Sequence, residues 1–145
     1  MKNKILVLNL ILLAGISLTA AGKDLQSNYD AAKKSATERG LPIFAYFSVS
    51  SKMECTRFNS IILQDPEFQK YASSNLIMFQ VDFSAKPPVT DEIKKQRQAL
   101  LKLYGISDLP VVLLLNAKGE IIATINYDKG GPAVYIQKIK SILGK

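Results

Sequence analysis

The sequence predicts an α/β fold: a single domain with a central mixed β-sheet covered by helices on both faces. Residues 41–47 and 111–115 are short, almost wholly apolar runs, as expected of strands that are buried on both faces of a sheet. Segments with helical spacing of apolar residues separate the two runs. The second run and residues 120–125 flank a short turn ending in glycine, which predicts a hairpin and therefore an antiparallel pair. A last helix is expected over residues 132–143.

Length and composition bound the kind of protein. The chain has 145 residues, of which 48% are hydrophobic and 21% charged, values that are ordinary for one soluble globular domain and exclude disorder. The formal net charge of +7 falls to +5 without Lys2 and Lys4, and no arginine-rich run is present, so we expect no nucleic-acid partner. Because the chain has no histidine and one cysteine, histidine-based metal sites, triads and dyads are excluded. We therefore expect neither a cofactor nor a metal.

The N-terminus has the pattern of a secretory signal peptide. Residues 1–4 carry two lysines, residues 5–18 are mainly apolar, and residues 19–21 are small. This pattern predicts cleavage near residue 21, a mature domain over residues 22–145, and a periplasmic or secreted protein with no stable membrane insertion after cleavage. The alternative is an uncleaved anchor, although the apolar run contains Asn9, Gly15 and Ser17 and is short for a full span.

The first half of the domain is expected to begin with a helix, a strand and a second helix. The amphipathic pattern over residues 24–39 predicts a helix that Gly40 ends in the left-handed conformation. The first core strand follows at residues 42–48, and a helix is expected over residues 53–63. The side chains expected to point inward from that helix are Phe58, Ile61 and Ile62.

The next elements are also marked by their end signals. Asp65 is placed to cap a helix with Pro66 at its first position. A second core strand is expected over residues 76–83. Thr90 is placed to cap a long helix over residues 91–104, in which lysines and an arginine form the solvated side. The buried side of this helix is expected to consist of Ile93, Leu100, Leu101, Leu103 and Tyr104.

Two junctions in this order resemble the thioredoxin-like superfamily, and the step Asp65-Pro66-Glu67-Phe68 with the expected strand over residues 76–83 resembles the longer thioredoxin-like domains of the bacterial envelope. The strand ending at Phe47 leads through a loop into a helix, where the family carries Cys-x-x-Cys; here the motif reads Lys52-Met53-Glu54-Cys55. Pro110 stands directly before the second buried run, where the family has a cis-proline. The resemblance covers about residues 25–143 and implies the thioredoxin-like fold.

The same resemblance implies that the active site is degenerate. Lys52 falls at the first cysteine of the motif and Cys55 at the second. Tyr46 falls at the buried aspartate that serves the second cysteine in the family, and the chain has no tryptophan. Dithiol exchange needs one thiolate to attack the substrate disulfide and a second thiol to resolve the mixed disulfide. We therefore expect dithiol turnover to be lost.

Cys55 and Lys52 are candidate site residues with open alternatives. Cys55 is the candidate catalytic residue if the helix N-terminus, Lys52 and Arg57 stabilise a thiolate, an effect that Glu54 opposes. It is a small buried hydrophobe otherwise, or it forms a disulfide-linked dimer with a second copy. Lys52 is a candidate binding residue for an anionic group, or a solvated lysine.

Leu109 and Pro110 are the other candidate binding residues. The resemblance implies a cis Leu109–Pro110 bond that exposes the backbone of Leu109 for pairing with an extended peptide. The alternative is that the cis bond persists only as part of the fold.

Three functions follow from these residues. The leading hypothesis is an exported peptide- or protein-binding module, redox-inactive or weakly active, built around Cys55 and Leu109–Pro110. The alternative is an enzyme, a monothiol thiol-disulfide oxidoreductase that uses Cys55 with an external resolving thiol. A structural subunit of a larger envelope assembly is the third.

Overall fold

The computed structural model describes residues 28–84, 86 and 88–145. The predicted signal peptide and the start of the predicted helix over residues 24–39 lie outside the described residues. Within the described part of the chain, no helix is long and apolar enough to cross a membrane.

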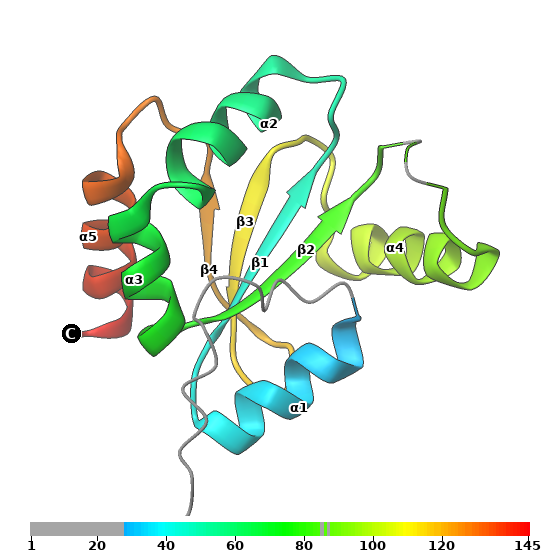
Figure 1. The fold of residues 1–145 in the computed structure, drawn as a ribbon. Coiled ribbons are helices and arrows are strands. Elements are labelled where there is room, and N and C mark those ends of the chain that lie inside the picture. Colours follow the sequence, from blue (N-terminus) through cyan, green and yellow to red (C-terminus); the bar gives the residue numbers. More distant parts are fainter. Residues whose placement is uncertain (1–27, 85, 87) are drawn as a thin grey trace, which may run out of the picture.

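The sheet is mixed, as predicted. Strands β1 (Ile43–Ser48) and β2 (Ile77–Asp82) pair in parallel, whereas β3 (Val111–Leu115) pairs antiparallel with β1. Strand β4 (Ile121–Asn126) pairs antiparallel with β3 and completes the predicted hairpin. The spatial order is β2-β1-β3-β4, so β1 and β3 are central and β4 lies at one edge (Figure 1).

Helices cover both faces of this sheet. Helices α1 (Tyr29–Arg39) and α4 (Asp91–Tyr104) pack on one face, and α2 (Met53–Phe58), α3 (Pro66–Asn75) and α5 (Pro132–Leu143) pack on the other. Figure 1 shows α3 and α5 side by side, with α2 above the end of β1. The thioredoxin-like α/β architecture is therefore confirmed.

The core explains why β1 reads as an uninterrupted apolar run. All six of its residues are buried, with alternate side chains entering the two faces of the sheet. Phe44 packs edge-on against Phe68 of α3, with ring centroids 5.6 Å apart. Tyr46 stacks on Phe58 of α2 at 4.7 Å. The first core strand thus brings the site-bearing helix α2 into the core.

The predicted helix ends are confirmed where they depend on local chemistry. The Asp65 side chain accepts a hydrogen bond from the Phe68 amide at the start of α3, and Pro66 is the first residue of that helix. Thr90 accepts from the Ile93 amide at the start of α4. Gly40 ends α1 at φ 63°, in the left-handed region.

The prediction that Ile61 and Leu103 point into the core was wrong. The predicted helix over residues 53–63 is α-helical only to Phe58 and continues as a π-helix over Asn59–Leu63. The wider π-turn keeps Ile62 in the core but rotates Ile61 outward, where it is exposed. In α4 the buried stripe is narrow, because Leu100 is its only fully buried residue; Leu103, about 60° round the helix from Leu100, is exposed.

A hydrogen-bond network ties three distant segments together on the α1/α4 face. The hydroxyls of Tyr29 and Tyr104 lie 2.6 Å apart. The Tyr104 hydroxyl lies 2.7 Å from the carbonyl oxygen of Gly119, to which it donates. Gly119 has φ 86°, and a Cβ atom there would lie 2.0 Å from the Tyr29 hydroxyl oxygen. The β3–β4 turn therefore depends on glycine both for its backbone conformation and for space.

Candidate functional site

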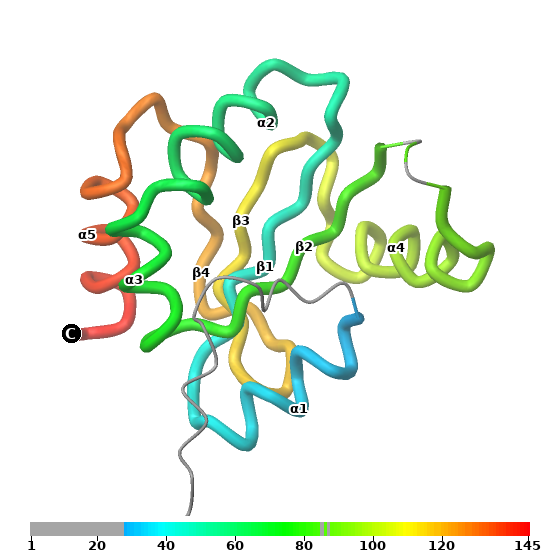
Figure 2. The backbone as a smooth tube through the Cα atoms, viewed as in Figure 1, coloured from blue at the N-terminus to red at the C-terminus, as the bar shows by residue number. Residues whose placement is uncertain are grey.

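Cys55 lies in the first turn of α2 and is buried, with 3% of its surface exposed. Its Sγ accepts a hydrogen bond from the Val49 amide at 3.4 Å, in the loop between β1 and α2. Figure 2 traces this loop from the carboxyl end of β1 into α2. Since a thiol must meet a substrate disulfide directly to attack it, burial places Cys55 out of reach in this conformation.

Tyr46 fills the space beside Cys55. The side chain is fully buried, and its hydroxyl donates to the Cys55 carbonyl oxygen at 3.1 Å. Burial, together with the neighbouring Cys55, raises the pKa of the Tyr46 hydroxyl far above its usual range, so it keeps its proton. At the position where the family has a buried aspartate, this chain therefore has a neutral tyrosine, Tyr46, which donates a hydrogen bond to the backbone.

Lys52 precedes α2 and bridges to the loop before β3. Its Nζ donates to the Asp108 carboxylate at 2.5 Å and to the Leu109 carbonyl oxygen at 3.1 Å. The hydrogen bond that Lys52 donates to Asp108 raises the pKa of Lys52. Lys52, and next the Leu109 amide, which donates to the same carboxylate at 2.8 Å, lower the pKa of Asp108. Both polar backbone groups of Leu109 are thus occupied within the chain.

The Leu109–Pro110 peptide bond is cis, as predicted. Lys52, Leu109 and Pro110 line one open cleft of about 680 Å³, which also contains Asp108 and Tyr127. Three of the four predicted site residues therefore lie together.

Cys55 faces a different cavity. It lines a polar cavity of about 290 Å³ behind α2, together with Tyr46, Ser48, Gln80 and Asp82. Gln80 donates to the Ser48 hydroxyl at 3.3 Å, so the cavity is bordered by satisfied polar groups. Among the described residues, no group of three or more histidine, cysteine, aspartate or glutamate side chains is placed to hold a metal ion.

Sequence reasoning missed Asp108 as the partner of Lys52, and it missed the role of the Tyr46 hydroxyl. A signal for Asp108 was present, because the residue directly precedes Leu109–Pro110 and carries a charge opposite to that of Lys52. No comparable signal existed for Tyr46, since an aromatic residue in a buried strand is usually explained by packing alone.

Comparison with known proteins agrees with this geometry. The family model described as thioredoxin-like matches residues 24–117, which is more than half of the chain. This chain belongs to the thioredoxin-like family. Within the family it is 31% identical over 125 residues to the disulfide bond reductase DsbH of Chlamydia pneumoniae, covering 85% of this chain and 75% of DsbH.

Two further proteins are similar to this chain, one over most of its length and one over a shorter segment. A solved structure of a DsbH oxidoreductase superposes with a TM-score of 0.78 and 31% identity, over 86% of this chain and 88% of that one. The thioredoxin-related protein DsbJ of Chlamydia pneumoniae is 28% identical over 90 residues, which are 61% of this chain and 26% of DsbJ. This thioredoxin-like chain is therefore homologous to proteins related to thiol-disulfide exchange, and it has one cysteine.

Proposed function

We propose that this thioredoxin-like protein binds a peptide or protein partner in the cleft beside Lys52, Leu109 and Pro110, and does not run a dithiol cycle. The observation that carries the proposal is the position of Lys52. At the motif position where the family places its attacking thiol, an ammonium group is hydrogen-bonded to Asp108 and Leu109. We infer that the cleft still serves docking, although the reacting group is replaced.

The surface around the cleft supports a protein ligand. Met53, the residue after Lys52, has an exposed side chain. Tyr127, directly after the end of β4, lines the cleft. An exposed methionine and a partly buried tyrosine beside a polar centre are suited to contact apolar side chains of a peptide. Lys52 and Asp108 offer one charge of each sign, with 44% and 83% of their side chains exposed.

A monothiol oxidoreductase remains the competing function, and it requires an accessible Cys55. The assay is reduction of a model protein disulfide by a general thiol reductant, with wild type compared against Cys55→Ser. We expect equal initial rates, because the only thiol is buried. A wild-type rate well above that of Cys55→Ser would replace the binding proposal with the monothiol enzyme. A disulfide-linked dimer through Cys55 is tested with the same two proteins by nonreducing electrophoresis, in which only wild type could show it.

Binding is tested with a displayed library of random peptides. We expect selected peptides to bind wild type and to perturb the NMR signals of the Met53 and Leu109 amides. Lys118→Met, which removes a lysine in the distant β3–β4 turn, serves as the control and should leave binding unchanged, whereas Lys52→Met should change it. Peptides whose binding leaves both amides unperturbed would contradict the proposed site.

The proposed location is the cell envelope or the exterior, after loss of residues 1–21. The sequence pattern of the leader supports this proposal. The intact mass of the protein isolated from the envelope is expected to lack the leader. A mass that retains Met1, with the protein held in the membrane, would overturn it.

A further inference from the structure

The cleft beside Lys52 carries a net negative charge in a basic protein. Among the described residues, the charged ones that line it are Lys52, Glu54 and Asp108, one ammonium against two carboxylates. The whole chain, in contrast, has a formal net charge of +7 at pH 7. Charges farther apart than about 8 Å are largely screened at physiological ionic strength. A group bound in the cleft is therefore governed by the lining charges rather than by the charge of the whole molecule.

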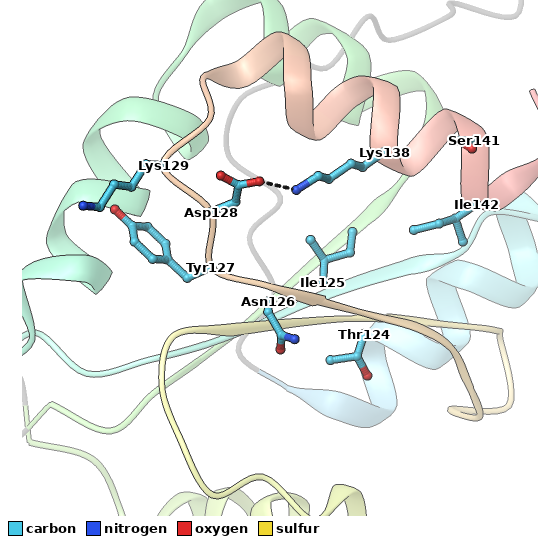
Figure 3. A pocket seen from close by; sticks show the side chains of 9 residues that line it. All are labelled: Thr124, Ile125, Asn126, Tyr127, Asp128, Lys129, Lys138, Ser141 and Ile142. Atoms are coloured by element: carbon cyan, nitrogen blue, oxygen red, sulfur yellow. Dashed lines mark hydrogen bonds and ion pairs between the residues drawn. The ribbon is translucent and has the colours of Figure 1, made fainter.

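The basic residues that follow Tyr127 in the chain belong to a separate groove. Lys129 and Lys138 line the groove between β4 and α5, and they do not line the cleft (Figure 3). Lys138 donates to the Asp128 carboxylate at 2.5 Å, drawn as a dashed line in Figure 3, so its charge is balanced there. Within the described part of the chain, Lys52 is thus the one cation that lines the cleft.

The polar groups of the cleft leave hydrogen-bond acceptors open. Lys52 uses two of its three N–H donors, on the Asp108 carboxylate and on the Leu109 carbonyl oxygen. The bonds that Asp108 accepts from Lys52 and from the Leu109 amide both end on Oδ1, so Oδ2 of this exposed side chain is open to a ligand. An anionic ligand would have to take Lys52 away from Asp108, whereas a cationic ligand finds a free carboxylate oxygen.

Glu54 strengthens this preference without a contact of its own. Its side chain is exposed, lines the cleft and, among the described residues, makes no hydrogen bond or ion pair. The pKa of Lys52 is raised mainly by the hydrogen bond to Asp108, and the charge of Glu54 adds to the rise. Glu54 therefore lies close enough to act on a charge held beside Lys52 and Asp108.

We propose that the cleft selects peptides with a basic side chain, arginine or lysine, whose cation pairs with Asp108 Oδ2 in the field of Glu54. The alkyl stem of such a side chain is apolar and covers apolar surface while its charged head stays in water. Leu109 and Pro110 directly follow Asp108 and are partly buried walls of the same cleft, so the stem packs there. This basic-ligand preference rests on the proposed peptide binding in the same cleft.

The test compares three pools of short, acetylated, dye-labelled peptides that differ only in a fixed central residue: arginine, glutamine or glutamate. The flanking positions are randomised over alanine, leucine, valine and threonine. Fluorescence anisotropy gives the Kd of each pool for the protein with the N-terminus that the cell leaves on it. We expect the Kd of the arginine pool to be roughly three- to tenfold below that of the glutamine pool, and the glutamate pool to bind most weakly.

Charge reversal at Glu54 separates the local effect from the net charge. Glu54→Lys makes the lining charge net positive and should reverse the ranking, so that the glutamate pool binds more tightly than the arginine pool. Glu38→Lys is the matched control, because it makes the same change near the end of α1, which leads into the start of β1, whereas Glu54 follows the end of β1. It should leave the ranking unchanged. Both glutamates are exposed, so the fold is expected to persist.

The outcomes distinguish the preference from the binding itself. Equal Kd values for the arginine and glutamine pools would overturn the basic-ligand preference and leave peptide binding in place. A ranking that survives Glu54→Lys, or that Glu38→Lys reverses as well, would also overturn the preference. If no pool binds wild type, the peptide-binding function fails, and the preference fails with it.

Discussion

Replacing Tyr46 with aspartate would return the family's carboxylate to its position, but the structure predicts a large loss of stability. The Tyr46 ring is fully buried and stacks on Phe58 at 4.7 Å. Deleting a buried ring of this size costs about 3–5 kcal/mol, and losing the hydrogen bond to the Cys55 carbonyl costs about 1 kcal/mol more. We therefore expect Tyr46→Asp to lower the free energy of unfolding by about 5 kcal/mol, which approaches the whole stability of many domains.

Two matched variants separate the contributions. Tyr46→Phe removes only the hydroxyl and should cost about 1 kcal/mol, because the Cys55 carbonyl keeps its hydrogen bond from the Asn59 amide. Tyr46→Asn has the size of aspartate without its charge, so its difference from Tyr46→Asp at neutral pH measures the buried charge. Urea unfolding followed by far-UV circular dichroism is the assay, since the chain lacks tryptophan.

The pH dependence of this difference has a definite sign. Burial should raise the pKa of the introduced carboxyl in the folded state above its unfolded value. The folded state then keeps a proton that the unfolded state has released, so the aspartate variant gains stability as the pH falls toward the unfolded value. The gap to Tyr46→Asn should close over that range. A gap that does not change with pH, or an aspartate variant as stable as Tyr46→Phe, would refute the packing around Tyr46 described here.

Three other outcomes are expected. Lys52→Cys should restore only a little disulfide reduction, measured as initial rate against Cys55→Ser, because Tyr46 occupies the buried position from which a carboxylate would assist the resolving step; fast turnover would contradict this. Gly119→Ala should lower the free energy of unfolding, measured in urea, by at least about 2 kcal/mol, because a Cβ atom would clash with the Tyr29 hydroxyl and because alanine disfavours the φ of 86° at this position; an unchanged midpoint would show that the turn relaxes freely. Because Lys52 lowers the pKa of Asp108, their contact should persist from neutral pH downward and be lost only in acid below the usual aspartate range; a carboxyl carbon titration with a midpoint at or above 3.8 would be the opposite result.

The sequence was sufficient where structure depends on neighbouring residues. The apolar run before Ser48 predicted β1, Asp65 and Pro66 predicted the start of α3, and α5 begins and ends where expected. These features are encoded within a few residues, by burial on both faces of a strand or by a cap. The cis bond at Pro110 came from the family resemblance, which fixes a position in the fold rather than a local preference.

The sequence was insufficient where the outcome depends on distant packing. The contact between Lys52 and Asp108 joins residues 56 positions apart, and it exists only because the fold brings α2 beside the loop before β3. The sequence left open whether Cys55 is exposed. Its burial depends on two tertiary contacts, with the Val49 amide of the loop and with the Tyr46 side chain. The outward turn of Ile61 follows from a π-helix, whose extra residue per turn is not visible in an apolar pattern that suits an α-helix.

The occupied backbone of Leu109 would make the proposed peptide-binding cleft selective for particular ligand sequences. An extended chain that pairs with Leu109 has to break the bonds to Lys52 and to Asp108 before it forms its own, so main-chain pairing exchanges hydrogen bonds one for one and adds little net affinity. A bare backbone would attract any unfolded segment. Here the gain has to come from ligand side chains that bury apolar surface on residues such as Met53, or that replace the released charges. The proposed peptide-binding cleft should therefore discriminate among sequences and reject most unfolded chains.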